Sequence, residues 1–270
     1  IFMNKKNPIA IFDSGVGSLS IIKEVRKLLP NENYIYLADK KHFPYGEKTH
    51  NDLLNIIQNT IEYLLKHFKP KLIVLASNTP SIQILHKIKK YETEIIGVFP
   101  PIPEAVNISK TGHIAILATQ NTVKSPELDE YIKSQKIPSE VTITKFNASS
   151  MVELVETGLF LSNEEKSLQL ISDELTKLDK IDNLIDTITL SSTHLPFLNK
   201  YFNALRPNLN LIDPAKIVSE KVKKSLERNF QDSEGKGTLQ ILVSQEKELL
   251  ETIIRKLGIY EEVNEMCLDF

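Results

Sequence analysis

Short apolar runs and longer stretches with helical periodicity follow one another along this chain. The runs are rich in branched side chains and predict buried strands, at residues 9–12, 34–38, 72–76, 94–99, 114–117, 141–146, 188–190, 208–212 and 239–243. Apolar residues spaced three and four apart predict helices, at residues 19–29, 51–68, 81–91, 163–178, 217–230 and 247–257. This order predicts an α/β fold.

Two of the predicted strands end in closely similar polar sequences. Residues 72–76 lead into Ser77-Asn78-Thr79-Pro80, and 115 positions later residues 188–190 lead into Ser191-Ser192-Thr193-His194-Leu195-Pro196. Small polar side chains at the carboxyl end of a strand are typical of a ligand site in an open α/β sheet. We therefore take these two strand ends as candidate site segments.

A second repeat indicates two related lobes. Ile114-Ala115-Ile116-Leu117 nearly repeats Ile9-Ala10-Ile11-Phe12 at a separation of 105 residues. Because both repeats keep the same order, we expect two pseudo-symmetric α/β lobes with a ligand cleft between them. The prolines at 100, 101 and 103 mark the boundary. We assign residues 3–100 and 210–270 to a discontinuous first lobe and residues 101–209 to a second lobe. We expect Ile1 and Phe2, which precede Met3, to be foreign to the protein.

Charge and cysteine content restrict the partners. The formal net charge of -2 gives no electrostatic indication that the protein binds nucleic acid or an anionic membrane. The single cysteine, Cys267, excludes an internal disulfide and fits a cytoplasmic protein. No apolar run has the length of a membrane span, and we expect no signal peptide. The six histidines show no metal-ligand spacing, so we expect a small-molecule ligand and no metal.

Two further loops follow predicted strands and carry candidate chemistry. Asp13-Ser14-Gly15-Val16-Gly17-Ser18 follows residues 9–12 and leads into a helix. In a purely structural interpretation, Ser18 or Ser20 caps that helix. In a functional interpretation, the Asp13 carboxylate and the backbone N–H groups of the turn bind the amino and carboxylate groups of an amino-acid ligand. The turn is neither a dinucleotide-binding fingerprint nor a Walker loop. In the second loop, residues 39–48, the local sequence favours a packed Tyr45 over a ligand contact.

With these segments assembled, the chain resembles the aspartate/glutamate racemase family. The resemblance rests on Phe12-Asp13-Ser14-Gly15-Val16-Gly17, Pro44-Tyr45-Gly46, Ser77-Asn78-Thr79, Thr119 and Thr122, the segment from Val152 to Gly158, and Thr193-His194 before Pro196. It implies a substrate pocket for glutamate, aspartate or another small carboxylate, cofactor-independent chemistry, and a set of substrate-binding residues: Asp13, Ser14, Tyr45, Gly46, Asn78, Thr79, Thr119, Thr122, Thr193 and His194.

The catalytic positions depart from the family pattern. Family members move the α-proton between two cysteines on opposite faces of the substrate, whereas this chain has Ser77 and Ser192 at those positions. A thiol has a pKa of about 8.5, so thiolate is accessible near neutral pH, and a hydroxyl is a far weaker acid. We therefore predict little or no two-thiol racemase activity.

Neighbouring positions differ from the family as well. Ser18, Pro80, Ser191 and Leu195 stand where the family usually has other residues, which favours natural divergence over an engineered double substitution. Phe99-Pro100-Pro101 stands where family members normally carry a glutamate that supports the histidine at the position of His194. On this interpretation His194 lacks its supporting carboxylate.

Three functions remain open from the sequence. The first is α-proton chemistry on an acidic amino acid with Asp13 and His194 as acid/base groups, although His194 could equally be structural. The second is a non-catalytic relative that binds a small carboxylate or a protein partner, and the third is a changed reaction. A Ser-His-Asp hydrolase is disfavoured because the chain has no GxSxG elbow. The oligomeric state stays open, with a homodimer among the alternatives.

Overall fold

The computed structural model describes residues 6–229 and 235–270 of the 270-residue chain. The described residues form two compact units, which we call the first lobe (residues up to 98 and from 215 onward) and the second lobe (residues 99–214). Residues 231–234 of the polar loop expected at residues 231–237 lie outside the described residues, as do residues 3–5 at the start of the expected first lobe.

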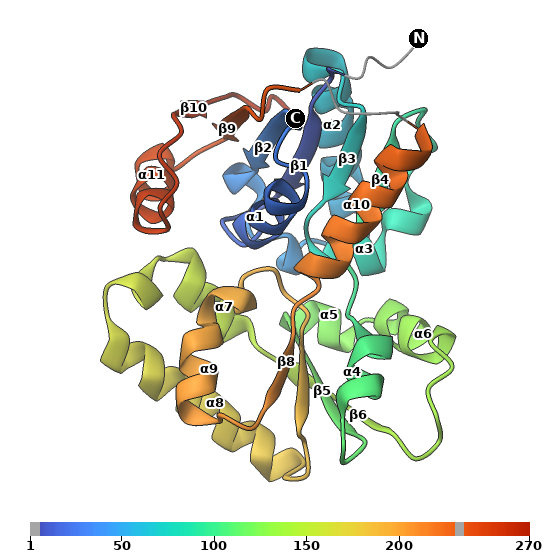
Figure 1. Ribbon diagram of the computed structural model, residues 1–270, viewed down its shortest axis with the longest axis vertical. Coiled ribbons are helices and arrows are strands. Elements are labelled where there is room, and N and C mark those ends of the chain that lie inside the picture. Colours follow the sequence, from blue (N-terminus) through green and yellow to red (C-terminus); the bar gives the residue numbers. More distant parts are fainter. Residues whose placement is uncertain (1–5, 230–234) are drawn as a thin grey trace. The chain divides into compact units, whose positions relative to one another are not determined.

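The first lobe is built around a parallel six-stranded sheet (Figure 1). The strand order is β10-β9-β2-β1-β3-β4. The strands are β1 (Ile9–Asp13), β2 (Tyr34–Ala38), β3 (Leu72–Leu75), β4 (Glu94–Gly97), β9 (Leu239–Val243) and β10 (Val263–Glu265). The helices are α1 (Leu19–Leu28), α2 (His50–Phe68), α3 (Asn78–Gln83), α10 (Ala215–Asn229) and α11 (Lys247–Lys256), with 3-10 turns η1 (Lys40–His42), η2 (Tyr45–Glu47) and η3 (Leu85–Lys87).

Alternation along the strands divides the apolar side chains of this sheet between its two faces. On one face, residues of β1, β2 and β3 pack against the buried stripe of α2, which consists of Leu53, Ile57, Ile61 and Leu64. Figure 1 shows α1 and α10 on the other face. Helix α2 begins where the Thr49 side chain accepts a hydrogen bond from Asp52 N–H, and it ends at Lys69 in the left-handed region.

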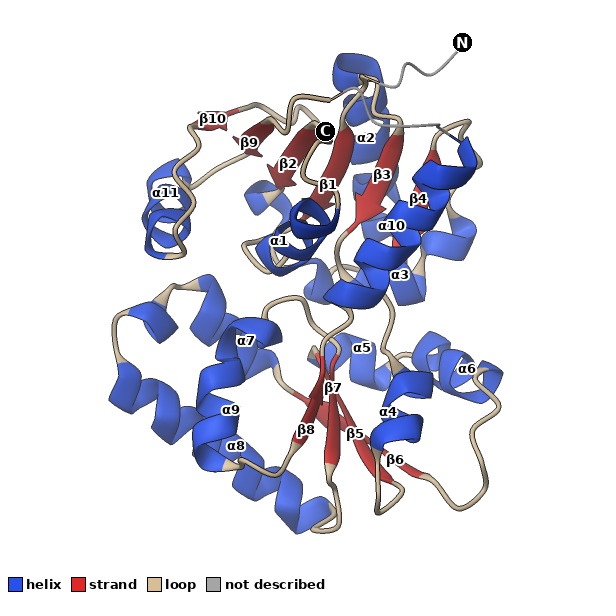
Figure 2. Ribbon diagram, in the orientation of Figure 1, coloured by secondary structure: helices blue, strands red, loops and turns tan. Residues whose placement is uncertain are grey.

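The second lobe has a parallel four-stranded sheet in the order β6-β5-β7-β8, drawn in red in Figure 2. Its strands are β5 (His113–Ala118), β6 (Thr142–Asn147), β7 (Thr187–Leu190) and β8 (Asn210–Ile212). Its helices are α4 (Ile102–Ile108), α5 (Gln120–Lys124), α6 (Pro126–Ser134), α7 (Ser149–Glu156), α8 (Glu164–Ile181) and α9 (Asn199–Leu205), with 3-10 turns η4 (Leu159–Leu161) and η5 (Leu195–Leu198).

The internal repeat is visible in the strand orders. The order β2-β1-β3-β4 in the first lobe corresponds to β6-β5-β7-β8 in the second. Phe12 pairs with Leu75, and 105 and 115 residues later Leu117 pairs with Leu190. The sequence separations thus describe equivalent strands in equivalent register, and the α/β fold expected from the repeats is confirmed.

Several predicted elements need correction. The helix expected at residues 81–91 is instead α3, which begins at Asn78 and ends at Gln83, followed by the 3-10 turn η3. The expected lobe boundary after residue 209 lies after residue 214, because β8 pairs with β7 and completes the second sheet. Neither Ser18 nor Ser20 caps α1: the Ser18 hydroxyl donates to the Tyr36 hydroxyl, and the Ser20 hydroxyl donates to the Gly17 carbonyl.

Candidate functional site

The carboxyl ends of β1 and β3 bring the first-lobe candidates together. Ala76 N–H donates to the Phe12 carbonyl at 2.8 Å, so the chain leaves the two neighbouring strands side by side. Strand β1 ends at Asp13 and the turn after it begins with Ser14, and the turn after β3 carries Ser77, followed by Asn78 and Thr79 in the first turn of α3. All five side chains are at least nine-tenths buried. A strand edge that buries this many polar groups has the features of a binding site.

Two polar atoms at this edge have no partner among the described residues. The Ser77 hydroxyl makes no hydrogen bond there, and Asn78 Oδ1 is buried without one, while Asn78 Nδ2 donates to the Val98 carbonyl at 3.4 Å. Leaving a buried acceptor unsatisfied costs about 1–3 kcal/mol. A ligand that donates an N–H or O–H to Asn78 would remove this cost.

The segment of residues 39–47 joins the same edge through backbone contacts. Asp39 N–H donates to the Asp13 carbonyl at 2.7 Å, and Tyr45 N–H donates to the Ser14 hydroxyl at 3.4 Å. The Tyr45 side chain belongs to the apolar core of the lobe and its hydroxyl donates to Asp39 Oδ2 at 2.9 Å. Burial, with the Asp39 and Asp13 carboxylates adding to it, raises the pKa of Tyr45 well above its ordinary value. The side chain is thus a packed aromatic, and any ligand contact falls to the backbone of Tyr45 and Gly46.

The second lobe presents an equivalent edge at the carboxyl ends of β5 and β7. Ser191 N–H donates to the Leu117 carbonyl at 2.9 Å, which places the chain after β7 beside the chain after β5. Thr119 and Thr122 follow β5, and their hydroxyl oxygens are 3.0 Å apart. The 115-residue offset matches Ser192, Thr193 and His194 with Ser77, Asn78 and Thr79. Like Ser77, the Ser192 hydroxyl has no partner within the described part of the chain.

His194 has a carboxylate partner that the sequence interpretation missed. His194 Nε2 lies 2.7 Å from Glu156 Oε2, and both side chains are nearly fully buried. The expectation that His194 lacks such a partner was therefore wrong, since Glu156 comes from the end of α7 and not from residues 99–101. Glu156 lies four positions after Val152 on a face of α7 that also buries Val155, and a charged residue on such a face was the available signal.

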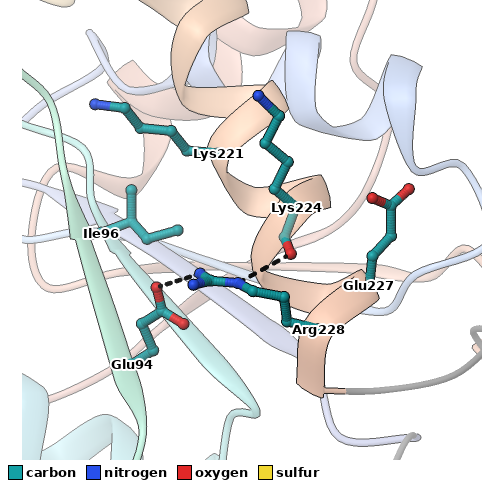
Figure 3. A pocket seen from close by; sticks show the side chains of 6 residues that line it. All are labelled: Glu94, Ile96, Lys221, Lys224, Glu227 and Arg228. Carbon is teal, nitrogen blue, oxygen red and sulfur yellow. Dashed lines mark hydrogen bonds and ion pairs between the residues drawn. The ribbon is translucent and has the colours of Figure 1, made fainter.

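A separate groove of the first lobe contains none of the predicted site residues. It has a volume of about 590 Å³ and is lined by Glu94, Ile96, Lys221, Lys224, Glu227 and Arg228 (Figure 3). Glu94 there accepts from the Ser225 hydroxyl at 2.5 Å and lies 3.7 Å from Arg228. The groove is open and its cations are exposed, so we do not count it as part of the candidate site.

Neither a metal centre nor a membrane-spanning helix appears in the described residues. Residues 6–229 and 235–270 contain no group of three or more His, Cys, Asp or Glu side chains placed to hold a metal ion. Within the same ranges, every helix is too short or too polar to cross a membrane.

Comparison with known proteins decides the family. The chain is 34% identical over 261 residues to the glutamate racemase of Clostridium botulinum strain Alaska E43, which covers 94% of this chain and 98% of that protein. It is 31% identical over 258 residues to the glutamate racemase of Clostridium perfringens ATCC 13124, over 94% and 96% of the two chains. The chain belongs to the glutamate racemase family. No family model matches it.

Solved glutamate racemase structures have the same fold. The Escherichia coli glutamate racemase, solved with L-glutamate and the activator UDP-MurNAc-ala, superposes with a TM-score of 0.85 at 28% identity, over 97% of this chain and 98% of that one. The Thermus thermophilus glutamate racemase, solved with beta-chloro-D-alanine, gives a TM-score of 0.81 at 28% identity over 98% and 99% of the two chains. The expected resemblance to racemases, and with it the fold class, is confirmed.

Proposed function

We propose that this glutamate racemase family member binds glutamate or aspartate, and that it transfers the α-proton very slowly or not at all. The observation that supports this most directly is the pair of serines. Ser77 and Ser192 occupy equivalent strand ends, are at least nine-tenths buried and carry hydroxyls without partners among the described residues. Proton transfer from a carbon acid needs a base of suitable pKa at this position, and a serine hydroxyl does not supply one.

The substrate class follows from the groups around the serines. The unsatisfied Asn78 Oδ1 accepts an N–H, and hydroxyls of Thr79, Thr119, Thr122 and Thr193 offer donors suited to carboxylates. We propose these residues, with Asp13, Ser14, Tyr45, Gly46 and His194, as the substrate-binding residues of the two strand edges. The Escherichia coli relative was solved with L-glutamate, which supports an acidic amino acid as the ligand.

Asp13 and His194 are the remaining candidates for acid/base groups in such a site. Asp13 lies beside the Ser77 turn, and Glu156 holds His194 beside Ser192. A carboxylate that accepts from one histidine nitrogen fixes the orientation and proton position of the ring. The Glu156–His194 pair favours a working ligand site and leaves room for slow proton exchange. We infer no role for a cofactor.

The alternative is a non-catalytic protein that binds a small carboxylate and responds to it, alone or with a protein partner. The two serines favour this alternative, because they remove the acid/base pair and leave the other polar groups in place. It predicts binding without turnover. We further propose a cytoplasmic protein, on its cysteine usage, with a homodimer as a state to be tested and no nucleic-acid or membrane partner.

The binding proposal is tested by calorimetric titration with L-glutamate, D-glutamate and L-aspartate, using 4-aminobutyrate, which lacks the α-carboxylate, as a control ligand. Asn78→Ala in the first lobe and Thr193→Ala in the second are each expected to weaken binding about tenfold. Asn55→Ala and Thr252→Ala, at exposed positions of α2 and α11, serve as matched controls. No detectable binding of either acid by the wild-type protein would refute the proposal.

A further inference from the structure

A fully buried carboxylate organises the segment that carries Tyr45 and Gly46. Asp39 follows β2, and His42 Nδ1 lies 2.9 and 2.8 Å from its two carboxylate oxygens. The Tyr45 hydroxyl donates to the same group at 2.9 Å, and the Ser244 hydroxyl donates at 3.3 Å from the end of β9. Three donors from two distant parts of the chain therefore meet at one anion.

The last residues of the chain lie against the same segment. The Lys41 ammonium donates to the carbonyl oxygens of Leu268 and Phe270. Leu268 is buried, and Met266 N–H donates to the Val243 carbonyl at 2.9 Å, so residues 266–270 are anchored to the sheet. We call residues 266–270 the terminal segment.

His42 connects the terminal segment with Asp39. Its Nε2 lies 3.3 Å from the Phe270 carbonyl oxygen, and its ring stacks on the Phe270 ring with centroids 5.8 Å apart and planes inclined by 10°. Both ring nitrogens thus face oxygens that only accept hydrogen bonds. A neutral imidazole carries one N–H and can satisfy one of them, whereas the doubly protonated ring satisfies both.

We propose that His42 is a positioning residue that couples the terminal segment to Asp39 and so fixes the backbone of Tyr45 and Gly46 for ligand binding, most firmly when both ring nitrogens carry protons. The backbone contacts of Asp39 with Asp13 and of Tyr45 with Ser14 extend this coupling to the strand edge. Only the ligand-binding consequence rests on the proposed function, because the coupling itself is a property of the unliganded chain.

Other charged and titratable groups around His42 have to be separated from it. Asp39 faces Nδ1, the Lys41 ammonium shares the Phe270 carbonyl, and the terminal segment contributes Cys267 and Asp269. On the side of α2, Glu62, Lys66 and His67 line a groove with Phe270. His67 is exposed, stacks on Tyr63 and lines the same groove as Phe270, so it is a matched control histidine.

Hydrogen exchange in the unliganded protein tests the coupling. The amides of His42, Phe43, Glu47 and Lys48 donate to carbonyls within the segment and report its opening. Exchange, corrected for intrinsic rates, is measured at two pH values on either side of the range in which histidines titrate. In the wild type we expect about tenfold stronger protection at the lower pH, in residues 40–48 and in the terminal segment.

Three variants decide the outcome. His42→Gln is expected to lose the pH dependence, His67→Gln to keep it, and His42→Arg to restore strong protection at both pH values, because a guanidinium always carries donors for both acceptors. The arginine variant also shows whether any loss in His42→Gln comes from misfolding. Wild-type protection with unchanged pH dependence in His42→Gln would overturn the proposal.

Glutamate titration of the same variants tests the link to the site. His42→Gln should bind about tenfold more weakly, and His42→Arg should bind like the wild type. Changed exchange with unchanged affinity would overturn the positioning role. If the wild type binds neither glutamate nor aspartate, the proposed function fails, and hydrogen exchange alone still decides the coupling.

Discussion

At the scale of single residues, the candidate site contains a buried carboxylate–histidine pair and, in our proposal, a serine at each of the two positions where protons would be exchanged. Glu156 holds His194 at 2.7 Å, and Asp13 is buried beside the turn that carries Ser77. A hydroxyl in place of a thiol changes the acidity of the group by many orders of magnitude and its size very little. The site should therefore recognise its ligand better than it transforms it.

The Glu156–His194 pair gives a prediction at this scale. Glu156→Gln replaces a buried carboxylate with an amide, which removes the charge that faces His194, and should lower the free energy of unfolding by about 1–3 kcal/mol. Glu153→Gln, three residues earlier on the same helix and exposed, should have no measurable effect. Urea unfolding compares the two, and equal stabilities would contradict a structural role for the pair.

At the scale of elements, the site depends on the packing of β4 against the helix that follows Ser77. A Cβ built on Gly97 would lie 2.6 Å from Leu85 Cδ2 and 2.8 Å from Ser81 Oγ. Ser81 in turn donates to the Ser77 carbonyl at 2.6 Å and accepts from Val98 N–H at 2.9 Å. The position of Ser77 is thus tied to the absence of a side chain at Gly97.

Gly97→Ala should destabilise the first lobe by about 1–3 kcal/mol, because the added methyl group overpacks this contact. The hydrogen bonds of Ser81 would have to shift with it, so glutamate affinity should also fall. Thermal unfolding and titration of the variant measure both effects. An alanine variant with wild-type stability and affinity would show that α3 moves freely on β4.

A second element, the loop between α4 and β5, is held by Asp186 just before β7. Asp186 accepts from the Ser109 hydroxyl and from the N–H groups of Lys110 and Thr111. Partial burial raises the pKa of Asp186. These donors, together with the Thr187 hydroxyl, lower the pKa by more than burial raises it, so the net pKa lies below its ordinary value. A carboxyl with a lowered folded-state pKa stabilises the fold above its unfolded-state pKa of about 3.9.

The corresponding prediction concerns acid stability. Asp186→Asn should be less stable than the wild type at neutral pH, and the difference should shrink as the pH falls below about 4, because the wild-type carboxyl then becomes protonated. Urea unfolding over a series of pH values measures the difference. A difference that does not change with pH would mean that the charge of Asp186 contributes nothing.

At the scale of the whole molecule, the repeats in the sequence were sufficient to predict two related α/β lobes, because buried parallel strands form continuous apolar runs that local sequence reveals. Short elements were less predictable. Helix α3 begins at Asn78 because the strand-end turn continues directly into it, and β10 is held by pairing with β9 more than by its own composition.

Contacts between residues distant in sequence account for what was missed in the candidate site. Glu156 is 38 residues before His194, and its role depends on how α7 packs beside the end of β7. The contact of His42 with Phe270 spans 228 residues. The local pattern marks Glu156 only as a charged residue on the buried face of α7 and names no partner for it, and nothing local marks the contact of His42 with Phe270. The serines at the strand ends, in contrast, could be identified from their place after apolar runs.

The most direct measurement of the central claim is α-proton exchange of L- and D-glutamate and aspartate in deuterated water, followed by NMR. The wild-type protein is compared with the Ser77→Cys/Ser192→Cys variant. We predict exchange by the cysteine variant at a rate at least about a hundredfold above the wild type, because only the acid/base pair is missing. Equal exchange by both proteins would contradict the claim that serine cannot act as the acid/base group. No detectable exchange by either protein would show that the site has diverged beyond these two residues.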